Sequence, residues 1–264
     1  MPFTEYIPAP ALRDYIDAYW VRETPLTNSP LQPVSRRVYA DGCADIFANT
    51  GITTSYFNTT VSMQPGHLYL GGTMTAYGLV SSIPNSLFTG IRFRPGGFFA
   101  LYRIPMEEAV DLVIEFPDQE LLSILSSTDA RGLTTDTIGL TTRLDKYFLT
   151  KPVRLKHDFV SIYQKVYRLK GQLSVEDLSR ECHVSHRTMD RIFKQNVGIN
   201  PKEFLRIVRF QEVLQRLQRS ASGQAPEESL LRIAYELGYY DHAHLTNEFK
   251  KYSGINPSEL LKDR

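Results

Sequence analysis

The chain has 264 residues, 42% of them hydrophobic and 22% charged, an ordinary composition for a globular protein with room for two buried cores. No apolar run approaches the ~20 residues of a membrane-spanning helix, and the first residues lack the basic and apolar segments of a secretory signal. The two cysteines, Cys43 and Cys182, are too few for a disulfide framework or a cysteine-rich zinc site. We therefore expect a cytoplasmic protein that has no membrane partner and no metal or other cofactor.

The net charge of +1 is divided unevenly along the chain. Residues 1–154 contain 12 Lys and Arg against 15 Asp and Glu, a net charge of −3. Residues 155–264 contain 18 against 14, a net charge of +4. This asymmetry favours an anionic partner for the C-terminal half.

Residues 1–100 alternate short apolar segments with turns rich in Gly, Pro, Ser and Thr, which predicts β-strands. The segments are RRVYADGCADIFANTG (36–51), GHLYLGGTM (66–74), YGLVSSI (77–83) and LFTGIRFRPGG (87–97). In the last segment, strand periodicity places Ile91 and Phe93 on one face and Arg92 and Arg94 on the other. Two aligned guanidiniums suit an anionic ligand, so Arg92 and Arg94 are candidate effector-binding residues. The alternatives are a solvated strand face or structural ion pairs.

From Pro95 onward the hydrophobic period becomes helical, with helices expected at 96–103, 117–127, 135–149 and 153–169. In the last of these, apolar residues recur every three or four positions and predict a core-facing stripe. The stripe consists of Leu155, Phe159, Ile162, Val166 and Leu169. The expected fold is α+β in two domains: a β-rich domain with following helices (1–152) and an all-helical domain (153–264).

The helical domain contains an internal sequence repeat, with the copies CHVSHRTMDRIFKQNVGINPKEF (182–204) and LGYYDHAHLTNEFKKYSGINPSEL (237–260). In the first copy, Ser174 caps one helix, His183 and Val184 form a tight turn, and Ser185 caps a second helix over 186–196. In the second copy, a helix over 229–237 ends at Gly238 and Asp241 caps a helix over 242–252. Each copy then has a glycine stop and the sequence Asn-Pro, which begins a new helix. After the first copy, Asn200 caps that helix and Glu203 is placed to close a capping box.

Each copy is therefore a helix, a tight turn and a second capped helix with a polar stripe, which describes a helix-turn-helix motif. The motifs span about 174–197 and 229–253, and the linker helix between them spans about 201–218. Polar stripes are often only solvated faces, but two copies in register favour DNA readers. The predicted DNA-contacting residues are Ser185, His186, Arg187, Thr188, Asp190, Arg191, Lys194, Asp241, His242, Ala243, His244, Thr246, Asn247, Lys250 and Lys251. Lys194, Lys250, Lys251 and the linker arginines are expected to contact phosphates.

Residues 233–260, and more weakly 178–204, resemble the AraC/XylS-type transcription regulators. The resemblance rests on Ile233-Ala234, Gly238-Tyr239, Asp241, His244, Phe249-Lys250, and Gly254 with Pro257. It implies sequence-specific binding of double-stranded DNA by two helix-turn-helix units joined by a long helix. Two positions depart from the family pattern. Asn247 stands where arginine is frequent, and His183 stands where the first turn commonly has glycine.

The N-terminal half is similar to the cupin-like barrel or sandwich domains that precede this unit, and YADGCADIFANTG (39–51) and GIRFRPGGFFALYRIP (90–105) carry that similarity. Such domains bind small molecules or mediate dimerisation. An enzymatic function is disfavoured, because residues 1–154 hold only His67 as a histidine ligand and only Cys43 as a thiol.

We therefore expect a DNA-binding transcription regulator rather than an enzyme. Its expected partners are DNA, a small-molecule effector, a second copy of the chain and the transcription machinery. The main alternative is a ligand-independent DNA-binding protein whose N-terminal domain only dimerises. A second is an architectural binder without sequence preference.

Overall fold

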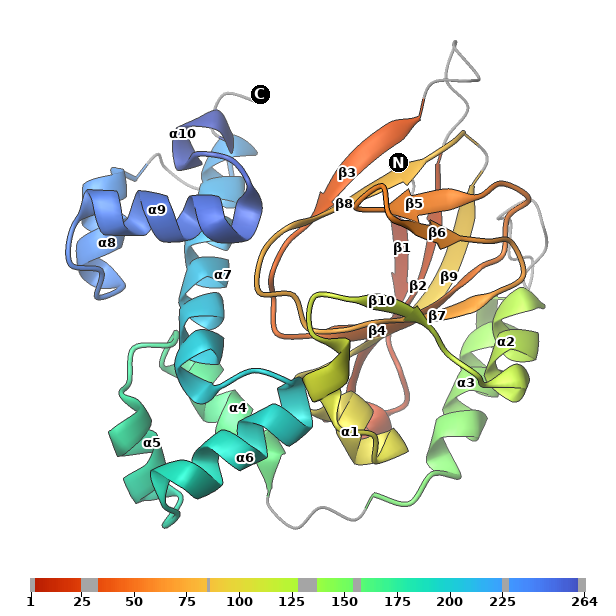
Figure 1. Ribbon diagram of the computed structural model, residues 1–264, viewed down its shortest axis with the longest axis horizontal. Coiled ribbons are helices and arrows are strands. Elements are labelled where there is room, and N and C mark those ends of the chain that lie inside the picture. Colours follow the sequence, from red (N-terminus) through yellow and green to blue (C-terminus); the bar gives the residue numbers. More distant parts are fainter. Residues whose placement is uncertain are drawn as a thin grey trace.

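A β-rich N-terminal part and a helical C-terminal part lie side by side in the computed structural model (Figure 1). The structure describes residues 3–24, 33–84, 86–127, 137–153, 158–224 and 228–260. Within these residues, no helix combines the length and the apolar character needed to cross a membrane. The same residues hold no group of three or more His, Cys, Asp and Glu side chains placed to bind a metal ion.

Two antiparallel sheets form the N-terminal part, and neither closes on itself within the described residues. The larger sheet has the order β1 (Phe3–Tyr6), β2 (Ile16–Glu23), β9 (Leu87–Phe93), β4 (Ala44–Asn49), β7 (Leu68–Gly71) and β10 (Val113–Glu115). The smaller sheet has the order β3 (Val34–Val38), β8 (Gly78–Ser82), β5 (Ser55–Phe57) and β6 (Val61–Met63). Side chains from both sheets, including Trp20, Phe88, Phe57 and Val80, share one apolar cluster. The arrangement is therefore an open sandwich, and the predicted β-rich domain is confirmed.

The other face of the larger sheet packs against helices. These are α1 (Gly97–Tyr102), α2 (Gln119–Ser126) and α3 (Thr137–Leu149), with the 3₁₀ turns η1 (Pro10–Leu12) and η2 (Met106–Ala109). Asp118 caps α2, because its carboxylate accepts from the Leu121 amide at 3.0 Å. The predicted helices at 96–103, 117–127 and 135–149 are confirmed within the described residues, from which 135 and 136 are excluded. Ile91 and Phe93 both face this second core, as strand periodicity predicts.

The C-terminal part consists of seven helices within the described residues. They are α4 (Phe159–Arg168), α5 (Val175–Glu181), α6 (His186–Val197), α7 (Pro201–Ala221), α8 (Leu230–Glu236), α9 (His242–Ser253) and α10 (Pro257–Leu260). Phe159, Ile162 and Val166 are buried as predicted. The prediction for Leu169 is wrong, because α4 ends at Arg168 and Leu169 leaves the helical period with 40% exposure. Leu155 lies outside the described residues.

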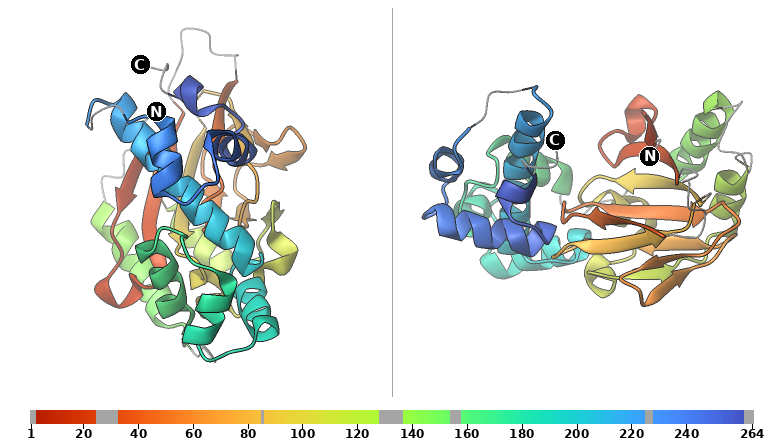
Figure 2. Two further views of the ribbon diagram at one scale, coloured as in Figure 1. Left: turned by 90° about the vertical axis from the view of Figure 1, so that its left-hand side faces the viewer. Right: turned by 90° about the horizontal axis from the view of Figure 1, so that it is seen from above.

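The two parts touch at both repeated glycines. Gly198 lies against Met106 and Val110 of the N-terminal part, and Gly254 lies against the ring of Tyr77. A Cβ atom at either glycine would come within 2.6 Å of these neighbours, and both glycines have positive φ. Figure 2 shows the helical part along one side of the sheets. The glycine of each repeat thus ends a helix and also permits contact between the two parts.

Candidate nucleic-acid interface

Both halves of the repeat fold into a helix, a turn and a second helix. Ser174 and Ser185 cap α5 and α6 by accepting from the backbone amides of Asp177 at 3.0 Å and Thr188 at 3.2 Å. In the second unit, Ser229 caps α8 through the Arg232 amide at 3.2 Å, and Asp241 caps α9 through the His244 amide at 2.7 Å.

The turn residues correspond as well. His183 (φ 53°) in the first unit and Gly238 (φ 70°) in the second both adopt the left-handed conformation. This conformation has a steric cost for a non-glycine residue such as His183. The helices expected at 186–196, 201–218, 229–237 and 242–252 are all present.

Helix α6 presents a continuous polar face to solvent. Met189, Ile192 and Phe193 are buried on its inner face. The predicted stripe is exposed along the opposite face: His186, Arg187, Asp190, Arg191 and Lys194. Among the described residues, no carboxylate lies within 4.0 Å of the charged groups of Arg187, Arg191 or Lys194. These three cations are therefore available to an external anion.

Helix α9 has a similar face, but several of its predicted contact residues are engaged within the protein. His242, Ala243, Asn247 and Lys250 are exposed. Thr246 is half-buried and its hydroxyl is enclosed without a hydrogen-bond partner in the described residues, so the expected stripe is interrupted there. Lys251 forms an ion pair with Glu203 of α7. Its predicted role as a free phosphate contact therefore competes with a contact to the linker helix.

His244 also points back toward the protein. Its ring meets the Tyr239 ring edge-on with centroids 5.3 Å apart, and its Nδ1 accepts from the Tyr240 amide at 3.4 Å. Its Nε2 lies 3.8 Å from Glu248. Tyr239 is buried, and burial together with the Glu248 charge raises the pKa of its hydroxyl. Tyr240 is 93% exposed and remains free to meet a partner.

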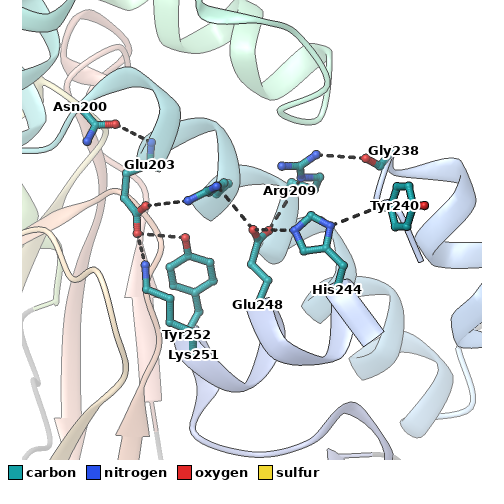
Figure 3. A network of polar contacts seen from close by, with 10 residues as sticks. Asn200, Glu203, Arg209, Gly238, Tyr240, His244, Glu248, Lys251 and Tyr252 are labelled. Atoms are coloured by element: carbon teal, nitrogen blue, oxygen red, sulfur yellow. Dashed lines mark hydrogen bonds and ion pairs between the residues drawn. The ribbon is translucent and has the colours of Figure 1, made fainter. Parts of the chain in front are cut away.

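A polar network fastens α9 to the linker helix α7 (Figure 3). Glu248 is 8% exposed and lies 3.7 Å from Nε of Arg206 and 3.9 Å from Nε of Arg209. One turn away, Glu203 accepts from the Tyr252 hydroxyl at 3.0 Å. Burial, and the charges of both glutamates, raise the pKa of Tyr252 and keep its hydroxyl protonated. The network holds α9 in a fixed position on α7. We call α6 and α9, the second helices of the two units, the first and second reader.

Two predictions need correction at this network. Glu203 was expected to close a capping box, but its carboxylate is directed at Lys251 and Tyr252 of α9, although Asn200 does cap α7. The linker arginines were expected to meet phosphates, but Arg206 and Arg209 pair with Glu248. Arg216 pairs with Glu236 at 2.7 Å and with Glu228 at 3.4 Å. Glu248 was not identified from the sequence, because an acidic residue on a helix is usually exposed to solvent.

Helix α7 sets the separation of the two readers. It has 21 residues, so it is about 31 Å long at about 1.5 Å per residue. Helix α6 packs beside the first turn of α7, and α9 crosses α7 farther along, where Phe210 meets Phe249 and Tyr252 (Figure 1). Successive turns of the B-DNA major groove are about 34 Å apart. The length of α7 is therefore close to the spacing of adjacent major-groove turns.

The candidate effector residues in β9 have partners inside the protein. Arg92 contacts Asp41, lies 3.3 Å from Asp45 and lies 3.9 Å from Asp17. Arg94 lies 2.8 Å from Asp17. The Asp41 charge raises the pKa of Arg92. These contacts match the ion-pair alternative, and an anion at Arg92 would compete with three carboxylates.

Comparison with known families agrees with this architecture. Residues 178–263 match the model of a helix-turn-helix domain, and residues 4–115 match that of a domain of unknown function, DUF6597. The C-terminal region is an AraC-type helix-turn-helix domain. This AraC-type domain contains both readers, the linker helix and the network of Glu203 and Glu248.

Relatives of the chain include transcription regulators. It is 31% identical over 115 residues to an uncharacterised HTH-type transcriptional regulator of Haemophilus influenzae, which covers 44% of this chain and 36% of that protein. It is 22% identical over 158 residues to the transcriptional activator RhaS of Klebsiella pneumoniae, with 55% of each chain covered. The chain thus spans between about a third and a half of these relatives.

The whole fold resembles that of ToxT from Vibrio cholerae. The TM-score is 0.50, the identity is 12%, and 99% of each chain is covered. A helical part that follows a β-rich part is therefore an arrangement that a solved structure shares.

Proposed function

We propose that the protein is a sequence-specific DNA-binding transcription regulator in the bacterial cytoplasm, and that α6 and α9 read adjacent major grooves. The observation that carries this proposal is the pair of helix-turn-helix units joined by one 21-residue helix, with Arg187, Arg191 and Lys194 on the first reader unpaired among the described residues. Arg206, Arg209 and Arg216 of the linker helix pair with carboxylates of α8 and α9 and hold the second unit on α7. We place the boundary between the DNA-binding domain and the preceding domain near residues 152 and 153.

Within this proposal the residues have separate roles. Arg187 and Arg191 read guanine O6 and N7, and Asn247 reads adenine N6 and N7. Lys194 and Lys250 contact phosphates, as do the backbone amides at the capped starts of α6 and α9. Ser185, Thr188 and Asp241 shape those helix starts, since their side chains are used in capping contacts.

The N-terminal domain is proposed to modulate DNA binding through a small-molecule effector. Support comes from its contacts with both readers at Gly198 and Gly254, which give it a means of altering their arrangement. A domain that only dimerises is the alternative, and DNA binding that is indifferent to every small molecule would favour it. A homodimer and contact with the transcription machinery belong to the same proposal.

Arg191→Ala tests the role of the first reader. We expect the dissociation constant for the preferred site to rise about 5–150-fold, equivalent to about 1–3 kcal/mol, with relaxed specificity at one base pair. Fluorescence anisotropy at fixed salt measures the change, because phosphate contacts make affinity depend on salt. Arg37→Ala, which removes an exposed arginine from β3 of the N-terminal part, is the control. An equal loss on random DNA would recast Arg191 as a phosphate contact.

A further inference from the structure

A partly open cavity of about 130 Å³ lies between the two sheets of the sandwich. Its wall is largely apolar, with Phe47 and Phe88 from the larger sheet and Phe57, Met63 and Val80 from the smaller one. A cavity of about 150 Å³ lined by Leu, Ile and Phe accommodates a molecule of the size of benzene. The space therefore suits an apolar body of about one aromatic ring.

Two arginines from opposite sheets also line this cavity. Arg22 lies on β2 and Arg36 on β3, where Arg36 shares the inner face with Val34 and Val38. Arg22 rests on the Phe3 ring, with its guanidinium carbon 4.2 Å from the centroid. Among the described residues, neither guanidinium has a carboxylate within 4.0 Å, in contrast to Arg92 on the same cavity wall.

Without an anion beside them, the burial of these two positive charges costs free energy. Burial, reinforced by the charge of Arg22, lowers the pKa of Arg36 to about 10. Burial also lowers the pKa of Arg22. The charged residues that line the cavity are Arg22, Arg36, Arg92, Asp41 and Asp45. Three guanidiniums and two carboxylates leave one positive charge, which a monoanion neutralises.

We propose that this cavity binds a small monocarboxylate with an apolar body, whose carboxylate is held by Arg22 and Arg36. Paired guanidiniums match the two oxygens of a carboxylate, and the apolar wall covers the rest of the molecule. The identification of this ligand as the effector rests on the proposed function. The binding of the ligand to the cavity does not. The site differs from the predicted pair, because Arg94 is outside the cavity wall and Arg92 is neutralised.

The cavity wall continues into the contact with the DNA-binding domain. Tyr39, Asp41 and Cys43 line the cavity. Within the same segment, the Ala40 carbonyl accepts from Gln211 of α7 and the Asp41 carbonyl accepts from Tyr167 of α4 at 3.1 Å. Gly42 lies against the ring of Phe204 at the start of α7. A bound ligand thus touches a segment that holds the linker helix, and differential binding between two positions of this segment would couple the ligand to the readers.

The probe for this proposal is 3-phenylpropionate, and the matched uncharged probe is 3-phenylpropionamide. Calorimetric titration of the full chain with each compound measures how much the negative charge of the ligand contributes to affinity, because the two compounds have nearly the same shape. We expect the wild-type protein to bind the acid about tenfold more tightly than the amide. Arg22→Gln and Arg36→Gln should each weaken binding of the acid about tenfold and leave that of the amide unchanged. Arg37→Gln removes the same charge from the exposed face of β3 and should change neither.

Equal affinity for the acid and the amide in the wild-type protein would overturn the proposal, and this comparison requires no variant to fold. An acid affinity that Arg22→Gln and Arg36→Gln leave intact would also overturn it, as would no binding of the acid at about 10 mM. These titrations contain no DNA. A failure of ligand binding is therefore separate from a failure of sequence-specific DNA binding.

Discussion

Replacing Phe204 by alanine is expected to lower the free energy of unfolding by about 3–5 kcal/mol. Phe204 is fully buried at the start of α7. Its ring meets Phe193 of α6 at a centroid distance of 5.4 Å and Tyr167 of α4 at 6.2 Å. A Cβ atom on Gly42 would lie 2.7 Å from the same ring. The substitution therefore opens a cavity where the first reader, α4, the linker helix and the N-terminal domain meet.

Urea unfolding followed by circular dichroism measures this loss. Tyr240→Ala is the control, because Tyr240 is 93% exposed and its removal should change the free energy of unfolding by less than about 0.5 kcal/mol. Similar losses for the two variants would show that Phe204 does not join these elements.

Glu248→Gln is expected to destabilise the protein by about 2–3 kcal/mol. The glutamine keeps the volume but removes the buried negative charge beside Arg206 and Arg209. The value lies below the about 3–5 kcal/mol of a broken buried pair, because the Arg206 side chain is 39% exposed and keeps Glu203 at 3.8 Å. Thermal and urea unfolding measure the change, and α9 should loosen on α7.

Glu176→Gln provides the matched control. Glu176 also pairs with an arginine, Arg180, at 3.0 Å, but both of these side chains are about two-thirds exposed. Its loss should cost less than about 1 kcal/mol. Equal effects of the two substitutions would mean that the network around Glu248 does not position the second reader.

Local sequence patterns predicted the helices and most of their ends, but the helix expected over 153–169 begins at Phe159 and ends at Arg168. The capping residues Ser174, Ser185, Asn200 and Asp241 act through amides three residues ahead, so short spacing alone identifies them. The buried positions of α6 and α9 follow from the helical period. The exposed stripe of α6 is the complement of that period and was equally predictable.

Contacts between distant segments were not predictable in this way. Glu203 and Lys251 are 48 residues apart and meet only because α9 packs on α7. Leu169 fits the helical period but lies beyond the helix end. The partners of Arg92 come from separate strands and turns, and the cavity arginines from two sheets, so only the fold brings them together.

The glycines of the two GINP segments have a second structural role that was not predicted from the sequence. Gly198 and Gly254 were predicted as left-handed helix stops, and both have that conformation. Their lack of a side chain also lets Met106 and Tyr77 approach. The repeated phrase therefore ends each reader helix at a place where the N-terminal domain touches it.

Selection of bound sequences from a random DNA pool, at near-physiological salt, tests the central claim most directly. The wild-type chain and the Arg191→Ala variant are compared. For the wild type, we predict a motif of two short blocks about one helical turn, or about 10 base pairs, apart. The variant should lose information at one base pair of one block. Recovery of no enriched sequence, or of a single block that Arg191→Ala leaves unchanged, would contradict a protein that reads DNA with two helices held on one linker.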